Sequence, residues 1–382
     1  MATNQNRHNQ QVGYVKLREN WIKIIESENI ICDRYVDICR IDKDAGDGNF
    51  SLVFKAKDIH NKKKWVVLKF FNPLKISEIY RLECFHRESD ILRDLRGQKN
   101  ILPLIQEKTD FNLTFEPKVG LSMQWPLQFY SSELGRFDIS KYIYYQKTNY
   151  LTNILFFREI CKAVQRIHKN KIMHRDLKPG NFLVFNKKQV CLSDFGTARY
   201  SRPKGTPIRN HYTAPVGDIR YTAPELLFGG LHFSDRHAFC ADIYSLGAIL
   251  FELFTKMIFN DLIFKEDKID DILVNFHTIS ESNRIEVFDG FIGGFSKNRE
   301  LPSIREYDAN IPKDLVHEVN ILYRSLACLD YRRRQSDFQR IFHRINICEK
   351  VIKYHKKIER WRKKKEERVC LILHLKNKMK RD

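Results

Sequence analysis

The chain has 382 residues and a formal net charge of +20, a length that predicts two or three domains or one large bilobal domain. Hydrophobic residues make up 43% and aromatic residues 12% of the chain, which excludes wholesale disorder. No apolar run approaches the roughly 20 residues that cross a bilayer, and the polar N-terminus has no apolar signal region. We therefore expect neither a membrane protein nor a secreted one, and the positive charge favours an anionic partner without choosing among them.

The cysteines are nine in number and form no CxxC pair. An odd count without that spacing argues against a disulfide framework and against paired zinc knuckles. We expect reduced thiols that mostly fill the core of a cytoplasmic protein.

The predicted secondary structure changes along the N-terminal part of the chain. Residues 1–34 predict a flexible arm and a leading helix, because apolar side chains recur at helical spacing over 15–28. Short β-rich runs separated by turn residues then predict an antiparallel meander up to about residue 71. A helical stretch at about 75–96 and two further apolar runs complete a small α+β unit. Pro126 and Gly135 act as breakers, so we expect this unit to end near residues 125–136.

From about residue 135 the chain is predicted to be mainly helical, beginning with an apolar stripe through 151–168. The last 30 residues carry a net charge of +9, nearly half of the total. Ile358, Trp361, Lys365 and Val369 share one helical face there, so we expect a basic helical tail at 346–382 with a narrow apolar edge.

The strongest chemical signal is the loop HRDLKPGN at residues 174–181. It places Asp176, Lys178 and Asn181 together, which supplies a carboxylate, a cation and an amide in one tight turn. Asp194, in the sequence Asp-Phe-Gly, follows an apolar run and supplies a second carboxylate at the end of a predicted strand. Carboxylate and amide oxygens are the ligands that Mg²⁺ prefers. The tripeptide Ala-Pro-Glu at 223–225 lies downstream.

These three motifs, in this order and at this spacing, resemble the eukaryotic-type protein kinase family, serine/threonine type. The resemblance covers about residues 35–345. It implies an α+β bilobal fold, with a small β-rich N-lobe that has one key helix (about 35–125) and a larger, mainly helical C-lobe (about 136–345), followed by the basic helix. It also implies that ATP and Mg²⁺ are the cofactors and that the γ-phosphoryl group passes to a hydroxyl of a protein substrate.

The resemblance assigns a role to each candidate catalytic residue. Asp176 would accept or orient the proton of the substrate hydroxyl, and Lys178 would neutralise the phosphoryl group as it moves. Asn181 and Asp194 would hold Mg²⁺. Lys69, in the run VVLK, would pair with the α- and β-phosphates of ATP.

Glu88 is the expected ion-pair partner of Lys69, with Glu83 as the runner-up. The sequence GDGNFSLV at 46–53 is similar to the glycine-rich loop of the family, with Ser51 in place of the third glycine. The other nucleotide-contacting positions implied by the resemblance are Gly46, Gly48, Val53, Val67, Met123 and Leu183.

One position departs from the family pattern. A threonine usually follows the glycine at position 217, but here the residue is Asp218, a like charge near Asp176. The alternative interpretation is therefore a weakly active kinase or a pseudokinase scaffold that presents the basic tail. Autophosphorylation is expected in the activation segment at 197–222, most of all at Thr206 or Thr213. The basic character of this segment favours an acidic or already phosphorylated substrate.

Two further function classes remain open at this point. A small-molecule phosphotransferase of related fold would share the loop at 174–181 but normally lacks Ala-Pro-Glu. A nucleic-acid-binding protein agrees with the net charge, although no known reader motif is visible. The basic tail is expected to bind an acidic partner, an anionic lipid or nucleic acid, or else to pack as a solvated helix.

Overall fold

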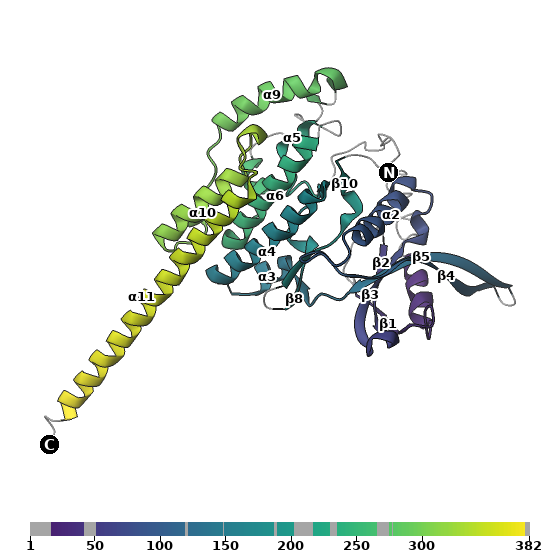
Figure 1. Cartoon of the computed structure of the whole chain (residues 1–382), viewed down its shortest axis with the longest axis horizontal. Helices are drawn as coiled ribbons and strands as arrows, with labels where there is room; N and C mark the ends of the chain where they lie inside the picture. The colour runs from purple at the N-terminus through teal and green to yellow at the C-terminus, as the bar shows by residue number, and fades with distance from the viewer. Residues whose placement is uncertain are drawn as a thin grey trace, which may run out of the picture. The chain divides into compact units, whose positions relative to one another are not determined.

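The computed structural model describes residues 17–41, 51–118, 121–147, 149–186, 189–201, 217–229, 235–265, 275–276 and 278–378. The chain divides into two compact units, one made of Met1–Ile139 and Gly180–His211, the other of Ser140–Pro179 and Tyr212–Asp382 (Figure 1). The first unit is built on a sheet and the second is mainly helical, so the α+β fold predicted from the sequence is confirmed.

The first unit is built on a five-stranded antiparallel sheet in the order β1-β2-β3-β5-β4. The strands are β1 (Tyr35–Arg40), β2 (Ser51–Asp58), β3 (Lys64–Phe71), β4 (Leu104–Lys118) and β5 (Leu121–Glu133). One long helix, α2 (Ile79–Asp94), lies between β3 and β4 in the chain. The predicted meander and helix are both present.

Pro126 does not end a strand, contrary to the sequence-based expectation. It lies within β5 and pairs with Asn112 of β4. Because β3 pairs with β5 from Phe129 onwards, the part of β5 around Pro126 belongs to a two-stranded ribbon with β4 (Figure 1). Proline is tolerated where one side of a strand has no partner that needs its missing N–H group.

The leading helix belongs to the core of the first unit. Residues 17–27 are helical, and Ile22 and Ile25 are buried in the same apolar cluster as Tyr35 and Phe129. The predicted arm, residues 1–16, lies outside the described residues.

A second, three-stranded sheet of the first unit carries the metal-ligand candidates. Its strands are β6 (Phe137–Asp138), β8 (Phe182–Asn186) and β9 (Gln189–Leu192), in the order β6-β8-β9. Asn181 ends the short helix η3 (Pro179–Asn181) directly before β8, and Asp194 follows β9 and caps η4 (Phe195–Thr197). The remaining described strands are short: β7 (Ile172–Met173) belongs to the second unit and β10 (Arg199–Tyr200) to the first.

The described helices of the second unit include α6, against which several of the others pack. They are α3 (Ile139–Tyr145), α4 (Tyr150–Lys169), α5 (Pro224–Gly229), α6 (Asp235–Thr255), α7 (Phe259–Ile263), α9 (Glu281–Lys297), α10 (Lys313–Leu326) and α11 (Phe338–Lys378). By length and composition α6 could cross a membrane, contrary to the expectation that no run is long enough. However, 94% of its apolar window is buried inside the protein, as expected for a core helix.

The basic tail is the continuation of a core helix. The first half of α11 buries Ile341, Ile345, Cys348 and Ile352 and packs against α4 and α10. Beyond residue 352 the helix is increasingly exposed, and its outer part extends past the rest of the second unit (Figure 1). All nine cysteines are free.

Candidate active site

Lys69 of β3 lies at the centre of a charged cluster in the first unit. Its Nζ is 2.6 Å from Oε2 of Glu88 on α2 and 3.6 Å from Oδ1 of Asp194. Glu88 is 3% exposed, so the pair is shielded from water on the carboxylate side. The structure therefore brings together the lysine, its expected partner and one of the two metal-ligand candidates.

Burial alone would lower the pKa of Lys69, but the carboxylates of Glu88 and Asp194 outweigh it and raise that pKa. Lys69 is thus held as a cation. Tyr130 lies directly opposite Lys69 on β5, is fully buried and hydrogen-bonds to Glu88. The sequence analysis missed Tyr130, because its position depends on the register between β3 and β5.

Asn181 and Asp194 are tied together through the residue between β9 and the Asp-Phe-Gly turn. The backbone N–H and the hydroxyl of Ser193 both donate to the carbonyl oxygen of Asn181, at 2.9 and 3.0 Å. Asp194 has a positive φ of 60°, a conformation that aspartate tolerates better than most residues. On the far side of the turn, Arg87 of α2 donates to the carbonyl of Gly196 at 2.8 Å.

These two residues offer oxygen ligands suited to a magnesium ion. The Asp194 carboxylate is 45% exposed and so can accept a hydrated cation, which matches the habit of Mg²⁺ of keeping several of its waters. Asn181 adds an amide oxygen. Its backbone carbonyl accepts hydrogen bonds from Ser193, the residue next to Asp194. Among the residues that the structure describes, no group of three or more His, Cys, Asp or Glu side chains could hold a metal.

Two of the expected nucleotide contacts share a sheet face with Lys69. Val53 of β2 pairs directly with Lys69, and Val67 lies two positions before it on β3. Because side chains alternate along a strand, all three point to the same face. Leu183 lies on β8, where its Cβ is 3.0 Å from the position that a side chain on Gly135 would occupy.

Met123 requires a correction. It is 41% exposed and pairs with Phe115 on the β4–β5 ribbon, seven residues before Tyr130. The structure therefore does not bring it to the Lys69 cluster, and the β5 residues paired with the Lys69 strand are those from Phe129 to Glu133. The length of the ribbon explains the error, because the sequence does not show where β5 joins the main sheet. Gly46 and Gly48 lie outside the described residues.

The second unit holds the loop at 174–179 through a buried aspartate. Asp242 of α6 accepts hydrogen bonds from the backbone N–H groups of His174 and Arg175, both at 2.8 Å. His168 Nε2 lies 2.9 Å from the same carboxylate. These contacts fix the backbone that presents Asp176.

The carboxylate of Asp176 has a partner on each oxygen. Lys178 Nζ lies 3.0 Å from Oδ2, and the backbone N–H of Asp218 donates to Oδ1 at 2.8 Å. Gly217 allows this approach, because its φ is +90° and a Cβ there would lie 2.5 Å from the carbonyl oxygen of Arg175. Asp176, Lys178 and the segment starting at Gly217 thus form one hydrogen-bonded group.

The side chain of Asp218 is engaged with Arg220, not with Asp176. Arg220 Nε and Nη2 donate to the two carboxylate oxygens at 2.9 and 2.6 Å. Burial would raise the pKa of Asp218, but the hydrogen bonds and the charge of Arg220 lower it. Only the backbone N–H of Asp218 reaches Asp176, so the conflict between like charges that the sequence suggested is relieved by Arg220.

The rest of this segment is fixed by buried polar side chains that the sequence analysis did not identify. Asn260 donates to the carbonyl oxygens of Ile219 and Thr222 at 2.7 and 2.9 Å. Glu252, fully buried on α6, accepts from the hydroxyls of Tyr144 and Tyr221 at 2.6 and 2.8 Å. Burial raises the pKa of Glu252.

Ala-Pro-Glu is anchored by a buried ion pair. Glu225 and Arg334 are both 0% exposed and form two hydrogen bonds, of which Nη2 to Oε2 measures 2.8 Å. Arg334 also donates to backbone carbonyls, including that of Cys328 at 2.6 Å. This pair has a structural role, because it ties the Ala-Pro-Glu segment to residues more than 100 positions later in the chain.

Comparisons with known proteins agree with this arrangement. The protein kinase domain family matches residues 39–345. The chain is 30% identical over 252 residues to a probable CTD kinase subunit alpha homolog of Encephalitozoon cuniculi (strain GB-M1), covering 65% of this chain and 68% of that protein.

Two relatives come from Dictyostelium discoideum. A probable cyclin-dependent kinase 8 is 29% identical over 216 residues, which is 55% of this chain and 52% of the relative. A probable serine/threonine-protein kinase is 28% identical over 247 residues, which is 64% of this chain and 34% of the relative. Since the family match spans most of the sequence and the motif residues are held as described, the chain belongs to the protein kinase family.

Proposed function

We propose that the chain is a serine/threonine protein kinase that transfers the γ-phosphoryl group of Mg-ATP to a hydroxyl of a protein substrate. The observation that carries the proposal is that each unit holds one charged candidate residue in place through its polar neighbours. Lys69 is held as a cation by Glu88 and Asp194, and Asp176 is held by Lys178 and the N–H group of Asp218. Membership of the kinase family supports the assignment of both groups to one reaction.

In this reaction Lys69 binds the α- and β-phosphates, and Glu88 sets the position of its ammonium group. Asn181 and Asp194 would hold Mg²⁺, which when bound supplies neutralisation of phosphate charge. Asp176 orients the acceptor hydroxyl and takes its proton. Phosphoryl transfer depends mainly on positioning and charge stabilisation, which is what these fixed side chains provide.

Several features support serine or threonine as the acceptor. Lys178 follows Asp176 by two positions, the spacing typical of serine/threonine kinases, and one relative is named as a kinase of this type. Autophosphorylation of the activation segment is part of the proposal, but Thr206 and Thr213 lie outside the described residues. An acidic or phosphorylated protein substrate is proposed from the basic residues of that segment, and a cytoplasmic location from the nine free cysteines.

A radiolabelled ATP transfer assay tests the proposal, with the protein itself and generic protein acceptors as substrates. Asp176→Ala should lower turnover by at least about a hundredfold with little change in nucleotide affinity, because its contact matters mostly in the transition state. Lys69→Ala should lower both the turnover and the affinity for the nucleotide. Lys64→Ala, an exposed lysine on the same strand, is the matched control and should leave activity unchanged.

The labelled amino acids should be phosphoserine or phosphothreonine. Label on tyrosine would contradict the acceptor assignment. A wild-type protein that binds ATP with Mg²⁺ but transfers no phosphate would favour the pseudokinase alternative.

A further inference from the structure

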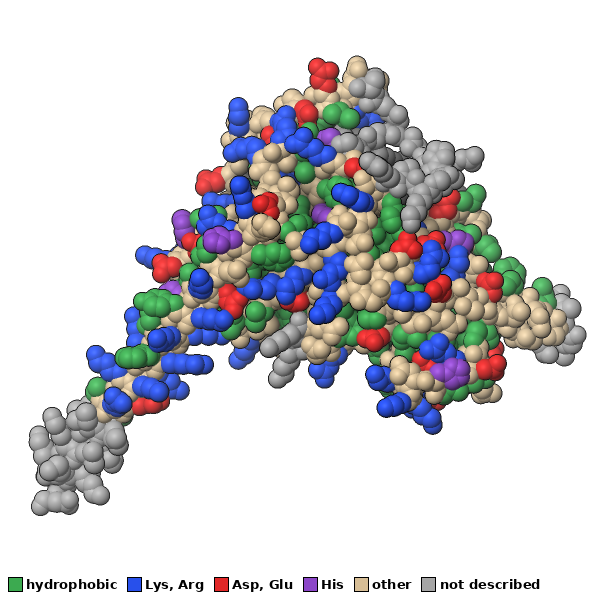
Figure 2. Space-filling model, viewed as in Figure 1, with side chains coloured by type: hydrophobic (Ala, Val, Ile, Leu, Met, Phe, Trp, Pro, Cys, Tyr) green, Lys and Arg blue, Asp and Glu red, His purple; other side chains and the backbone are tan. Residues whose placement is uncertain are grey.

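The outer part of α11 carries a dense positive charge that the proposed activity does not use. Residues 350–368 contain ten Lys or Arg and three Glu, over about 28 Å of helix at 1.5 Å per residue. Among the described side chains, Lys353 is the one member of this set that makes an ion pair, with Glu349. Figure 2 shows these basic side chains along the extending helix. The charge is therefore available to an outside partner.

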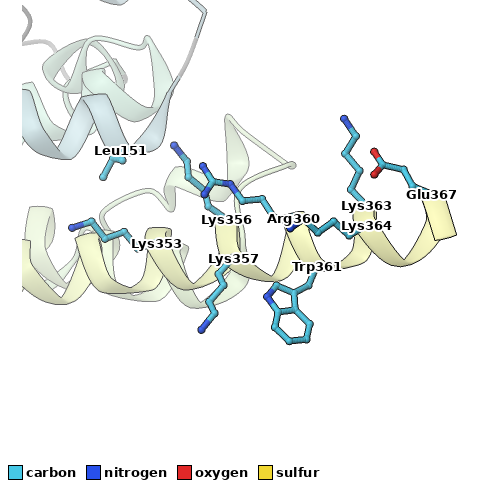
Figure 3. Close-up of a pocket in the computed structure, with 9 residues that line it drawn as sticks. All are labelled: Leu151, Lys353, Lys356, Lys357, Arg360, Trp361, Lys363, Lys364 and Glu367. Atoms are coloured by element: carbon cyan, nitrogen blue, oxygen red, sulfur yellow. The ribbon is translucent and has the colours of Figure 1, made fainter.

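Much of this charge gathers around one hollow. The hollow measures about 690 Å³ and lies between α11 and Leu151, at the start of α4 (Figure 3). Lys356 and Lys363 lie on the side of the helix toward Leu151, whereas Lys357 and Trp361 point away from it (Figure 3). Its lining from α11 comprises Lys353, Lys356, Lys357, Arg360, Trp361, Lys363, Lys364 and Glu367. This group is called the basic face below.

The basic face includes an aromatic side chain. Trp361 is 71% exposed, and about two turns away Tyr354 is 62% exposed. Large aromatic side chains are normally buried, so an exposed indole beside six cations is unusual for a merely solvated helix. In single-strand binding proteins, basic side chains that follow the backbone are combined with aromatic rings on which bases stack.

We propose that the basic face of α11 binds single-stranded nucleic acid, with the phosphates on its Lys and Arg side chains and a base stacked on Trp361. The row of cations along the helix matches a ligand that repeats its negative charge along a flexible chain. The hollow is open enough to admit such a chain, and Leu151 offers an apolar contact at its edge.

A membrane surface fits this region less well. The apolar edge made by Ile358, Trp361 and Val369 is interrupted by Lys365. A helix that lies in the membrane interface needs a broader apolar face than this. An acidic protein would satisfy the charge but would give Trp361 no stacking role.

The test uses the full chain and fluorescence anisotropy with a labelled 20-nucleotide oligo(dT) and oligo(U). If five or six phosphates are neutralised, the slope of log affinity against log salt should be about −4. The triple variant Lys356→Glu, Arg360→Glu, Lys363→Glu should bind about a hundredfold more weakly. The matched control is Lys62→Glu, Lys63→Glu, Lys64→Glu, which changes the net charge by the same amount at three exposed lysines of the first unit. It should bind the oligonucleotide nearly as tightly as the wild type.

Trp361→Ala separates base stacking from charge. It should weaken oligonucleotide binding about tenfold and leave binding of inorganic polyphosphate, which has no bases, unchanged. Circular dichroism checks that each variant is folded.

Three results would overturn the proposal. One is equal weakening by the triple variant and its control. Another is binding to vesicles containing phosphatidylserine that the oligonucleotide does not displace. The third is polyaspartate binding as tight as oligonucleotide binding, with no effect of Trp361→Ala on either. All these measurements are independent of phosphoryl transfer, so they stand whether or not the chain proves to be an active kinase.

Discussion

Replacing Arg220 with alanine should impair catalysis without disturbing ATP binding. Arg220 makes two side-chain hydrogen bonds to Asp218, whose side chain is 15% exposed, and its backbone N–H makes a third at 3.1 Å. The Arg220→Ala variant would keep the third contact but lose the other two. The Asp218 carboxylate would then be left without a cation beside the loop that orients Asp176.

The magnitude follows from these contacts. A hydrogen bond to a charged group contributes about 1.5–3 kcal/mol, and the 52% exposure of Arg220 reduces the value of the pair. A net loss of about 1.4 kcal/mol corresponds to about a tenfold fall in kcat/KM for the protein substrate. KM for ATP should change less than twofold, because Arg220 and Asp218 belong to the second unit, whereas Lys69, the residue proposed to bind the phosphates, belongs to the first.

Steady-state phosphorylation assays on four proteins would check this: the wild type, Arg220→Ala, Asp218→Thr and the double variant. Asp218→Thr removes the charge that needs Arg220, so the double variant should recover most of the lost activity. The coupling energy between the two positions should therefore be close to the loss seen in Arg220→Ala. If Arg220→Ala stays within twofold of wild type, or if the double variant is no better than the single one, the reasoning is wrong.

Two further predictions concern stability. Arg334→Ala leaves the buried Glu225 carboxylate unpaired and should lower the free energy of unfolding by about 3–5 kcal/mol. The control, Arg333→Ala at an exposed position, should change the free energy of unfolding by less than about 0.5 kcal/mol. Similar urea midpoints for the two variants would contradict this prediction. Asp58, fully buried, accepts two hydrogen bonds from Arg34, which hold its pKa below the usual 3.8. That stabilisation is present above pH 3.8 and is lost as the pH falls through the lower folded pKa, so Asp58→Asn should cost about 2 kcal/mol at pH 7 and progressively less in acid. A cost measured by urea unfolding that is the same at pH 7 and pH 3 would count against it.

The sequence by itself determined the family and the candidate site residues. The loop at 174–181, the Asp-Phe-Gly turn and Ala-Pro-Glu are local motifs, and a local motif keeps its residues together whatever the distant chain does. Short β-rich runs separated by turn residues likewise predicted β1 to β3, because strand and turn preferences depend on the local sequence. The ion pair between Lys69 and Glu88 was chosen by family resemblance, and the structure contains it.

Only the tertiary structure decided which distant residues meet. The register between β3 and β5 puts Tyr130, and not Met123, opposite Lys69. The side-chain direction of Asp218 depends on its hydrogen bonds to Arg220. The sequence suggested that Asp218 would repel Asp176, but the structure places the cation of Arg220 beside Asp218. Strand register and side-chain orientation are set by pairing and packing between segments far apart in the chain, and the composition of either segment alone does not contain that information.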